Sequence, residues 1–309
     1  MSRRIRTTAY LFATLAVAGT LTACGGDPLD SGSDSDSGGG GTIVVGSANF
    51  PESELLMEMY AQALEAEGVK VETKPNIGSR EVYMEAFKSG DIDLLPEYNG
   101  ALLAYLKPDG VPENVSAPED VYEALQEVLP EGSETLPQSE AEDKDTLTVS
   151  KETADKYSLK SIEDLAPVAK DLTLGGSPEF KERHQGLVGL DEVYGVTFKE
   201  FKPLDAGGPL TTGALAKGDI DVANVFSTDS SIPTNGWVVL EDPENLFLSQ
   251  NVVPLIRSEA LSSDAETALN AVSEALTTAN LTEALAKVQV DKADPATVAK
   301  EFLADNGVS

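Results

Sequence analysis

An internal repeat is the feature that most constrains the fold of this chain. Residues 86–98 read AFKSGDIDLLPEY and residues 214–226 read ALAKGDIDVANVF, so one phrase recurs 128 positions later. The Lys-Pro pairs at 74–75 and 202–203 keep the same offset, and each follows an alternating stretch and precedes a glycine-bearing turn. A repeat of this extent indicates two lobes that share one chain path.

Each half of the chain alternates strands with helices. In both halves a short apolar run leads through a Gly-Ser turn into a helix, and a second strand leads through the Lys-Pro turn into a second helix. Gly90 or Gly218 then stops that helix before a third strand begins, so the aspartates of the repeated phrase are expected to be structural. This alternation predicts an α/β fold in which each lobe is a mainly parallel sheet flanked by helices.

The segment after the second half predicts how the lobes connect. It contains helical stretches but no strands for a sheet of its own, so it must pack against the first lobe. The chain then crosses between the lobes twice and forms a hinge beside a cleft. We expect residues 42–145 with 252–309 in lobe 1 and residues 146–251 in lobe 2. Because ligands lie at the carboxyl ends of parallel strands, Tyr98 and Phe226 should each bring a ring to this cleft.

The first 41 residues are expected to direct export and not to fold. Residues 1–24 combine three arginines, a short apolar run and LTAC, which is typical of a secretory signal peptide. The last four resemble the lipobox of bacterial lipoproteins, so Cys24 is the expected lipidation site; a plain signal with an incidental cysteine is the alternative. Residues 25–41 are nearly all Gly, Ser and Asp and predict a flexible tether. We therefore expect an extracytoplasmic protein, lipid-anchored to the bacterial cell membrane.

The composition disfavours several classes of function. The chain carries 53 acidic and 22 basic residues, for a formal charge of −31, so no nucleic acid is expected as a partner. Its single histidine, His184, has no cysteine partner and no Glu-x-x-His pattern, so neither a metal nor another cofactor is expected. No Gly-x-Ser-x-Gly elbow is present, although two of the many carboxylates could serve a lipid-anchored extracellular hydrolase. The leading expectation is a binding protein without catalytic residues.

Several separated motifs resemble one known family in their order along the chain. They are IVVGSANFPESELLMEMYAQALEAEG, NIGSR, GDIDLLPEYNGA, FKERHQGLVGLDEVYG and VFSTDSSI. From about Thr42 onward the chain is similar to the glycine betaine/choline/carnitine substrate-binding lipoproteins of osmoprotectant ABC transporters. The resemblance implies a two-lobed, type II periplasmic-binding-protein-like fold that closes on its ligand. It also implies a monomer that delivers the ligand to a permease with a cytoplasmic ATPase; a ligand sensor with the same hinge is the alternative.

The resemblance further implies a cage of tyrosine rings around a trimethylammonium group, which cannot donate hydrogen bonds and favours ring faces. Tyr98 keeps one cage position, and Phe226 keeps a second as a ring without its hydroxyl. At the positions where the family often has two further tyrosines, this chain has Thr146 with Leu147 and Gln250 with Asn251.

The positions expected to meet an anionic ligand group depart from the family as well. Ala48 replaces the common lysine and Ala101 the common threonine, which leaves Arg183 as the basic candidate. We therefore expect a larger or more polar zwitterion than glycine betaine, such as carnitine or ergothioneine. Gln250 and Asn251 would supply its hydrogen bonds.

Three further polar residues are candidate ligand contacts. Ser47 and Asn49 lie at a strand-to-helix turn, where a helix N-terminus can meet a polar ligand group, and Asn99 follows the cage tyrosine. Structural alternatives exist for several candidates. Asn49 could simply cap the helix with Glu52 reaching back, the two rings could be core residues, and Arg183 could pair with a surface carboxylate.

Overall fold

The computed structural model describes residues 41–108, 110–112 and 115–308. Residues 40–309 form one compact unit. The predicted signal peptide, the lipidation site Cys24 and all of the predicted tether except Gly41 lie outside the described residues. Among the helices in the described part of the chain, none has the length and apolar character that a membrane span requires.

The first sheet has five strands in the order β2-β1-β3-β10-β4. Strands β1, β2 and β3 are parallel, whereas β10 runs antiparallel to both β3 and β4. The strands are β1 (Ile43–Gly46), β2 (Val71–Lys74), β3 (Leu94–Tyr98), β4 (Ser133–Thr135) and β10 (Val252–Arg257).

The second sheet repeats this arrangement in the order β7-β6-β8-β5-β9. Strands β6, β7 and β8 are parallel, and β5 lies antiparallel beside β8 in the place that β10 takes beside β3. The strands are β5 (Asp145–Val149), β6 (Thr173–Gly176), β7 (Glu200–Pro203), β8 (Val222–Phe226) and β9 (Val238–Val239).

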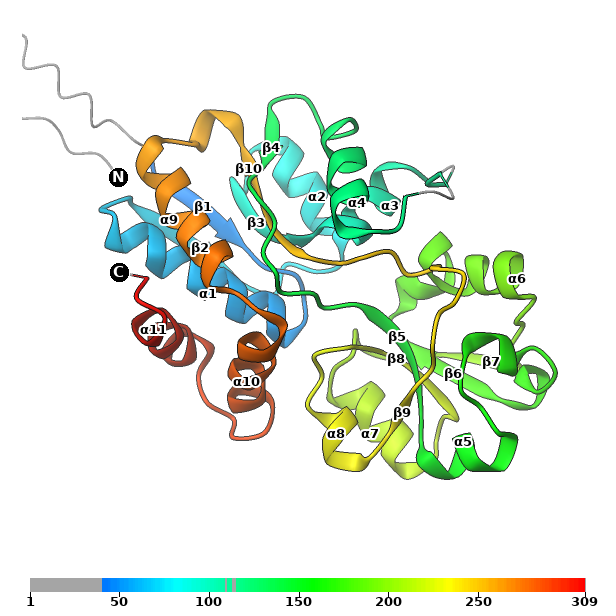
Figure 1. Ribbon diagram of the computed structural model, residues 1–309. Coiled ribbons are helices and arrows are strands. Elements are labelled where there is room, and N and C mark those ends of the chain that lie inside the picture. The colour runs from blue at the N-terminus through cyan, green and yellow to red at the C-terminus, as the bar shows by residue number, and fades with distance from the viewer. Residues whose placement is uncertain (1–40, 109, 113–114, 309) are drawn as a thin grey trace, which may run out of the picture. The chain divides into compact units, whose positions relative to one another are not determined.

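The chain passes between the two sheets twice, as the sequence predicted. Strand β5 follows β4 of the first sheet but joins the second, and β10 follows β9 of the second sheet but joins the first (Figure 1). The predicted two-lobed α/β fold is therefore confirmed. Each sheet also contains an antiparallel strand that the repeat alone did not predict. This strand is β10 in the first sheet and β5 in the second, and each follows a crossing from the other sheet.

Helices cover both sheets. We use "first lobe" for the first sheet with α1–α4 and α9–α11, and "second lobe" for the second sheet with α5–α8. The first-lobe helices are α1 (Pro51–Ala66), α2 (Arg80–Ser89), α3 (Asn99–Leu106), α4 (Pro118–Gln126), α9 (Ser263–Ala275), α10 (Thr278–Gln289) and α11 (Pro295–Asp305). The second-lobe helices are α5 (Lys151–Tyr157), α6 (Gly189–Tyr194), α7 (Pro209–Lys217) and α8 (Ser231–Asn235). Short 3₁₀ turns lie at Ile162–Leu165, Ala169–Asp171, Pro178–Lys181 and Ser258–Ala260, and a π-type turn at His184–Val188.

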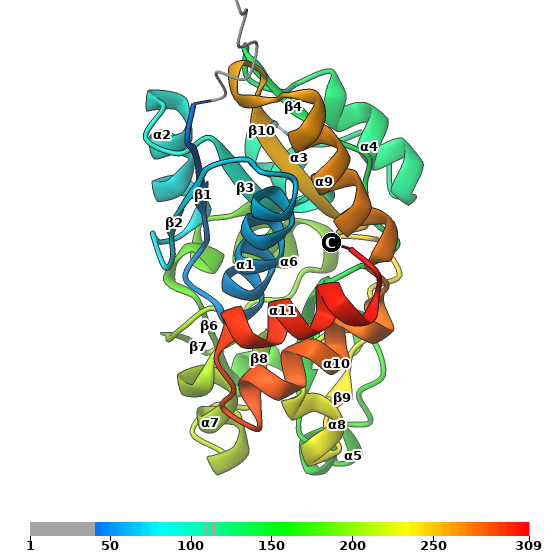
Figure 2. The same ribbon diagram turned by 90° about the vertical axis from the view of Figure 1, so that its left-hand side faces the viewer.

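The C-terminal helices complete the core of the first lobe. Figure 2 shows α11 and α10 beside α1, and the buried side chains Leu56, Met59, Leu281 and Phe302 join these helices in one apolar cluster. The tail therefore packs on the first lobe, as predicted from its lack of strands. Burial of these side chains stabilises the fold by about 1.5–3 kcal/mol each.

Helix α1 begins one residue later than the sequence suggested. Its N-cap is Phe50, whose side chain cannot cap, and Pro51 occupies the first turn. The predicted capping by Asn49 with Glu52 is therefore wrong. As a result, both side chains are available for other contacts, and Phe50 stands at the end of the turn that follows β1.

The repeated phrase has the structural role predicted for it. Gly90 and Gly218 adopt left-handed conformations at the ends of α2 and α7, with φ of 81° and 74°. The Asp93 carboxylate accepts a hydrogen bond from Val44 N at 2.9 Å, which ties the approach to β3 to strand β1. The same phrase therefore stops a helix and aligns the next parallel strand.

Candidate ligand-binding site

A small cavity of about 60 Å³ lies where the two lobes and their two connecting segments meet. Phe50, Arg80 and Tyr98 of the first lobe line it, and so do Asn224 and Phe226 of the second lobe. Asp143 and Gln250 line it from the segments that join the sheets, and Asp145 lines it from the start of β5.

Four aromatic residues line this cavity, and the rings of three of them lie close together. The ring centroids of Phe50 and Phe226 are 5.0 Å apart, and those of Phe50 and Tyr98 are 6.1 Å apart. Phe50 therefore bridges the two rings that the sequence placed at a shared cleft. Sequence reasoning missed Phe50 as a site residue, although a phenylalanine follows the Gly-Ser turn in both halves. The arrangement offers ring faces to a cation.

Tyr98 is held by a buried hydrogen-bond network. Its hydroxyl donates to Glu52 Oε1 at 2.7 Å, and the hydroxyl of Thr228 lies 2.6 Å from Glu52 Oε2. The same Thr228 hydroxyl lies 2.9 Å from Asp143 Oδ1, to which the Thr228 backbone N–H also donates. Glu52 belongs to the first lobe and Thr228 to the second, so this network joins the two lobes next to the Tyr98 hydroxyl.

Both carboxyl groups of that network hold protons more tightly than usual. Burial raises the pKa of Glu52 and of Asp143, and the neighbouring Glu52 raises that of Asp143 further. Two buried carboxyls that share one site do not both ionise readily, because each negative charge disfavours the other.

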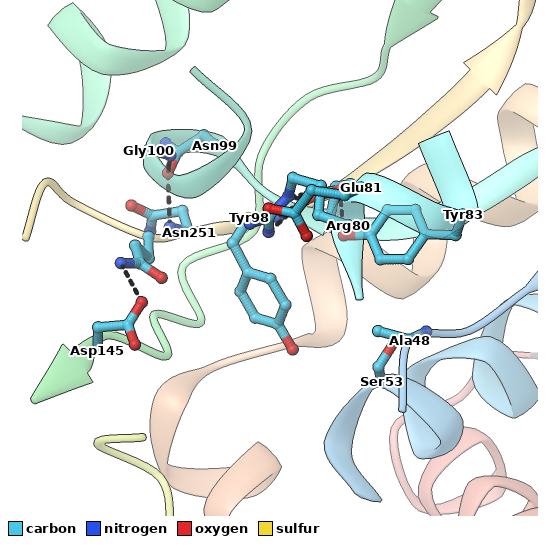
Figure 3. A network of polar contacts seen from close by, with 12 residues as sticks. Ala48, Ser53, Arg80, Glu81, Tyr83, Tyr98, Asn99, Gly100, Asp145 and Asn251 are labelled. Atoms are coloured by element: carbon cyan, nitrogen blue, oxygen red, sulfur yellow. Dashed lines mark hydrogen bonds and ion pairs between the residues drawn. The ribbon is translucent and has the colours of Figure 1, made fainter. Parts of the chain in front are cut away.

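A second buried network positions the wall of the first lobe. Arg80 Nε and Nη2 each donate to Glu97 at 3.0 Å, and the hydroxyl of Tyr83 donates to Glu97 Oε1 at 2.5 Å. The Tyr98 backbone N–H also donates to Glu97, whose side chain is fully buried. Figure 3 shows Arg80, Tyr83 and Tyr98 together at this wall. The ion pair fixes the guanidinium of Arg80 at the edge of the cavity.

Asp145, at the start of β5, holds two amide side chains at the cavity. Asp145 accepts hydrogen bonds from Asn224 Nδ2 at 2.9 Å and from Gln250 Nε2 at 3.3 Å. Both amides also line the cavity, so the carboxylate of Asp145 orients them. Asp145 was not among the predicted site residues.

Arg183 joins the lobes across the cleft. Its Nε and Nη2 each donate to Glu81 at 3.0 Å. Although burial alone would raise it, the hydrogen bonds and charge of Arg183 hold the pKa of Glu81 at about 2. Arg183 lines the cavity, as the predicted role requires, but its charge is balanced by this carboxylate.

An outer cavity of about 520 Å³ shares Arg80, Ala101, Asp145 and Arg183 with the small one. Tyr105 and His184 line this outer space as well. The two cavities are therefore neighbouring parts of one cleft, with the rings in the inner part. Within residues 41–108, 110–112 and 115–308, no cluster of three or more His, Cys, Asp or Glu side chains is placed to hold a metal ion.

The structure separates the predicted site residues into two groups. The cavity is lined by Asn49, Tyr98, Arg183, Phe226 and Gln250, and by Ala48 and Ala101, where the resemblance led us to expect a lysine and a threonine. Ser47, Asn99, Thr146 and Asn251 do not line it. The side chain of Leu147 is fully buried in the core of the second lobe.

The four residues away from the cavity have protein partners instead. Asn99 Oδ1 accepts from the Asn251 backbone N–H at 2.8 Å (Figure 3), and Asn251 Nδ2 donates to Ser139 O at 3.1 Å. The hydroxyl of Thr146 donates to Val225 O, and that of Ser47 accepts from Asn76 N. These side chains stabilise the hinge strands and turns that position the cavity.

Comparison with known proteins agrees with this geometry. Residues 41–305 match the family model for the substrate binding domain of ABC-type glycine betaine transport systems. The carnitine transport binding protein OpuCC of Listeria monocytogenes is 28% identical over 272 residues, which cover 86% of this chain and 87% of that protein. The glycine betaine-binding protein YehZ of Escherichia coli is 27% identical over 280 residues, 86% of this chain and 90% of that protein.

A solved structure of a glycine betaine/carnitine/choline ABC transporter protein superposes with a TM-score of 0.68 at 25% identity. It covers 86% of this chain and 99% of the solved chain. The fold, the inter-lobe cavity and the sequence match agree with one another, and such a protein binds a substrate for transport and is not an enzyme. The chain belongs to the family of substrate-binding domains of ABC-type glycine betaine transport systems.

Proposed function

We propose that the cavity between the lobes captures a small quaternary ammonium compound and that the protein delivers it to an ABC permease. The observation that carries the proposal is the group of three rings contributed by both lobes, with Phe50 between Tyr98 and Phe226. A trimethylammonium group has no N–H to donate, so ring faces are suitable hosts for it, and each contributes about 0.5–2 kcal/mol when desolvated.

The inter-lobe contacts support a binding mode in which the lobes close on the ligand. Glu52 and Arg183 each reach a partner on the opposite lobe, so closure brings the rings together. In this proposal the hinge lies at the lobe boundaries 145/146 and 251/252. Tyr98, Phe226, Asn49 and Gln250 contact the ligand, whereas Asn99 and Asn251 act by holding the hinge.

Isothermal titration calorimetry of the purified protein with a panel of quaternary ammonium compounds tests the proposal. We expect Tyr98→Leu and Phe226→Leu to weaken binding of the best compound by about tenfold each, the loss of one ring face. Tyr157→Leu is the matched control, because this tyrosine lies in the second lobe and does not line the cavity. Equal affinity in all three variants would contradict the proposal. Native mass spectrometry of the protein as purified would identify a ligand carried through purification.

We also propose that the protein is a monomer held outside the cytoplasm by a lipid on Cys24, with residues 25–41 as a tether. The lipobox-like LTAC sequence supports this anchor. Cell fractionation of two variants tests this anchor. Cys24→Ala should move the protein from the membrane fraction to the soluble extracytoplasmic fraction, whereas a Ser31→Ala control in the tether should stay with the membrane.

A further inference from the structure

We propose, on the basis of the function proposed above, that the preferred ligand is a quaternary ammonium cation with a hydroxyl group and no carboxylate. The inference concerns the charge that the ligand must bring to the inner cavity. It narrows the candidate quaternary ammonium compounds to those without an anionic group. The ligand proposed here is therefore a cation and not the zwitterion expected from the sequence.

The positive charges at the cavity are already balanced by protein carboxylates. Of the described residues that line it, Arg80 and Arg183 are the basic ones. Arg80 makes two hydrogen bonds of 3.0 Å to the buried Glu97, and Arg183 makes two of 3.0 Å to Glu81. Each guanidinium keeps N–H donors at Nη1, but its positive charge is already offset, so a ligand carboxylate gains less from it than from an unpaired cation.

The remaining charged groups at the cavity are acidic. Asp143, Asp145 and Glu179 all line it, and Glu52 lies directly behind Asp143 through Thr228. Ala48, which also lines the cavity, supplies no compensating charge. The inner cavity is thus net negative and favours a cation over a zwitterion.

The polar end of the ligand has a defined acceptor. The carboxylate of Asp145 accepts one hydrogen bond from Asn224 and a longer one from Gln250, and a carboxylate has about four lone-pair sites. Asp145 therefore keeps acceptor capacity toward the cavity that it lines. A hydroxyl group can donate to it, whereas a ligand carboxylate would meet it as a like charge.

Choline and glycine betaine are the probes for a direct test, because they share the trimethylammonium head and differ in a hydroxymethyl group versus a carboxylate. In calorimetry at neutral pH and moderate salt we expect choline to bind at least about tenfold more tightly than glycine betaine. Glycine betaine binding equal to or tighter than choline would overturn the inference and leave the proposed function intact. Failure of choline, glycine betaine and carnitine all to bind the folded protein would overturn both.

Two variants test whether Asp145 causes the expected preference for choline over glycine betaine. Asp145→Asn keeps the shape of the side chain and removes its charge, so we expect choline binding to weaken about five- to tenfold and glycine betaine binding not to weaken. Asp155→Asn is the matched control, since this exposed aspartate lies on α5 away from the cavity. A melting curve checks that each variant is folded. An unchanged choline-to-betaine ratio in folded Asp145→Asn would overturn the assignment of this carboxylate.

Discussion

The two lobes have the same scaffold but use it differently at the cavity. In the first lobe Asp93 accepts a hydrogen bond from Val44 N at 2.9 Å, and in the second lobe Asp221 accepts one from Thr173 N at 2.8 Å. These aspartates occupy equivalent places in the repeated phrase and make the same link between parallel strands. The repeat therefore preserves the contacts that build each sheet.

The side chains near the cavity differ in chemistry between the lobes. In the first lobe Glu97 precedes Tyr98 and binds Arg80, whereas in the second lobe the matching residues are Val225 and Phe226, without a buried ion pair. The first lobe thus presents a wall whose polar groups are held by hydrogen bonds. The second lobe adds the Phe226 ring, the Asn224 amide and the charged side chains of Glu179 and Arg183. A duplicated fold can thus keep the same strand contacts while its two copies contribute different polar groups to one site.

The largest expected effect comes from breaking the ion pair that distinguishes the first lobe. Glu97→Ala leaves the guanidinium of Arg80, which is 11% exposed, without its partner and should lower the free energy of unfolding by about 3 kcal/mol. Val225→Ala, at the matching position of the second lobe, removes only apolar contacts and should cost about 1–2 kcal/mol. Urea unfolding measures both values. Similar losses in the two variants would remove this distinction between the lobes.

The carboxyl pair between the lobes should give a pH-dependent stability. The pKa of Asp143 is raised in the folded protein, so the folded state binds more protons than the unfolded state above about pH 4, and the free energy of unfolding falls as pH rises from there. Asp143→Asn removes the part of this dependence that Asp143 contributes. Relative to wild type, the free energy of unfolding of the ligand-free variant should therefore be about 1–2 kcal/mol higher at pH ~8 than at pH ~5.

Thermal melting without ligand at the two pH values tests this expectation. Glu241→Gln, a change of an exposed carboxyl in the second lobe, is the control and should not alter the pH profile. A wild-type melting temperature that does not change with pH, or an Asp143→Asn protein that loses stability at the higher pH, would contradict it.

The two phenylalanines that follow the Gly-Ser turns offer a sharper test of the lobe difference. Phe50 faces the other rings at the cavity, whereas Phe180 is buried and packs near Phe247 with centroids 6.4 Å apart. Phe50→Leu should weaken ligand binding about five- to tenfold with little change in stability. Phe180→Leu should cost about 1 kcal/mol of stability and leave the affinity unchanged. The reverse result would show that the second lobe, not the first, provides the bridging ring.

The smallest effect is expected at the ion pair between the lobes. Arg183 and Glu81 are 32% and 43% exposed, so Arg183→Gln should lower the free energy of unfolding by less than about 1 kcal/mol. Because the pKa of Glu81 is lowered to about 2, this contribution is present above about pH 4.5 and is lost as pH falls toward 2. Chemical denaturation at both ends of that range measures it. A Lys181→Gln control removes a neighbouring exposed charge and should show no such loss.

The sequence predicted the strands, the helix ends and the two crossings well, because these features depend on local patterns that occur in both halves of the chain. The three parallel strands of each lobe, the helix stops at Gly90 and Gly218 and the two crossings all follow from short patterns. The antiparallel pairing of β5 with β8 and of β10 with β3 could not be derived from those patterns. Each of these strands joins the sheet that the chain enters after a crossing, so its partner is set by contacts distant in the sequence.

The site was harder to predict because one residue of register decides which side chain faces the cavity. On β5 the sequence singled out Thr146 and Leu147, but Asp145 lines the cavity and Leu147 lies in the core. Phe50 and Arg80 were missed for a related reason. Each belongs to a turn or helix start whose direction is set by packing between distant parts of the chain.

The exchange of strands between the halves sets an order in which the molecule can be assembled. The second sheet has all its strands once residue 239 is available, whereas the first still lacks its β10 strand, residues 252–257, and the helices that end at Asp305. Because a chain is synthesised from its N-terminus, the lobe whose synthesis begins first is thus the lobe that is completed last. Until its closing strand arrives, β3 stays an open edge that must be kept from pairing with another chain.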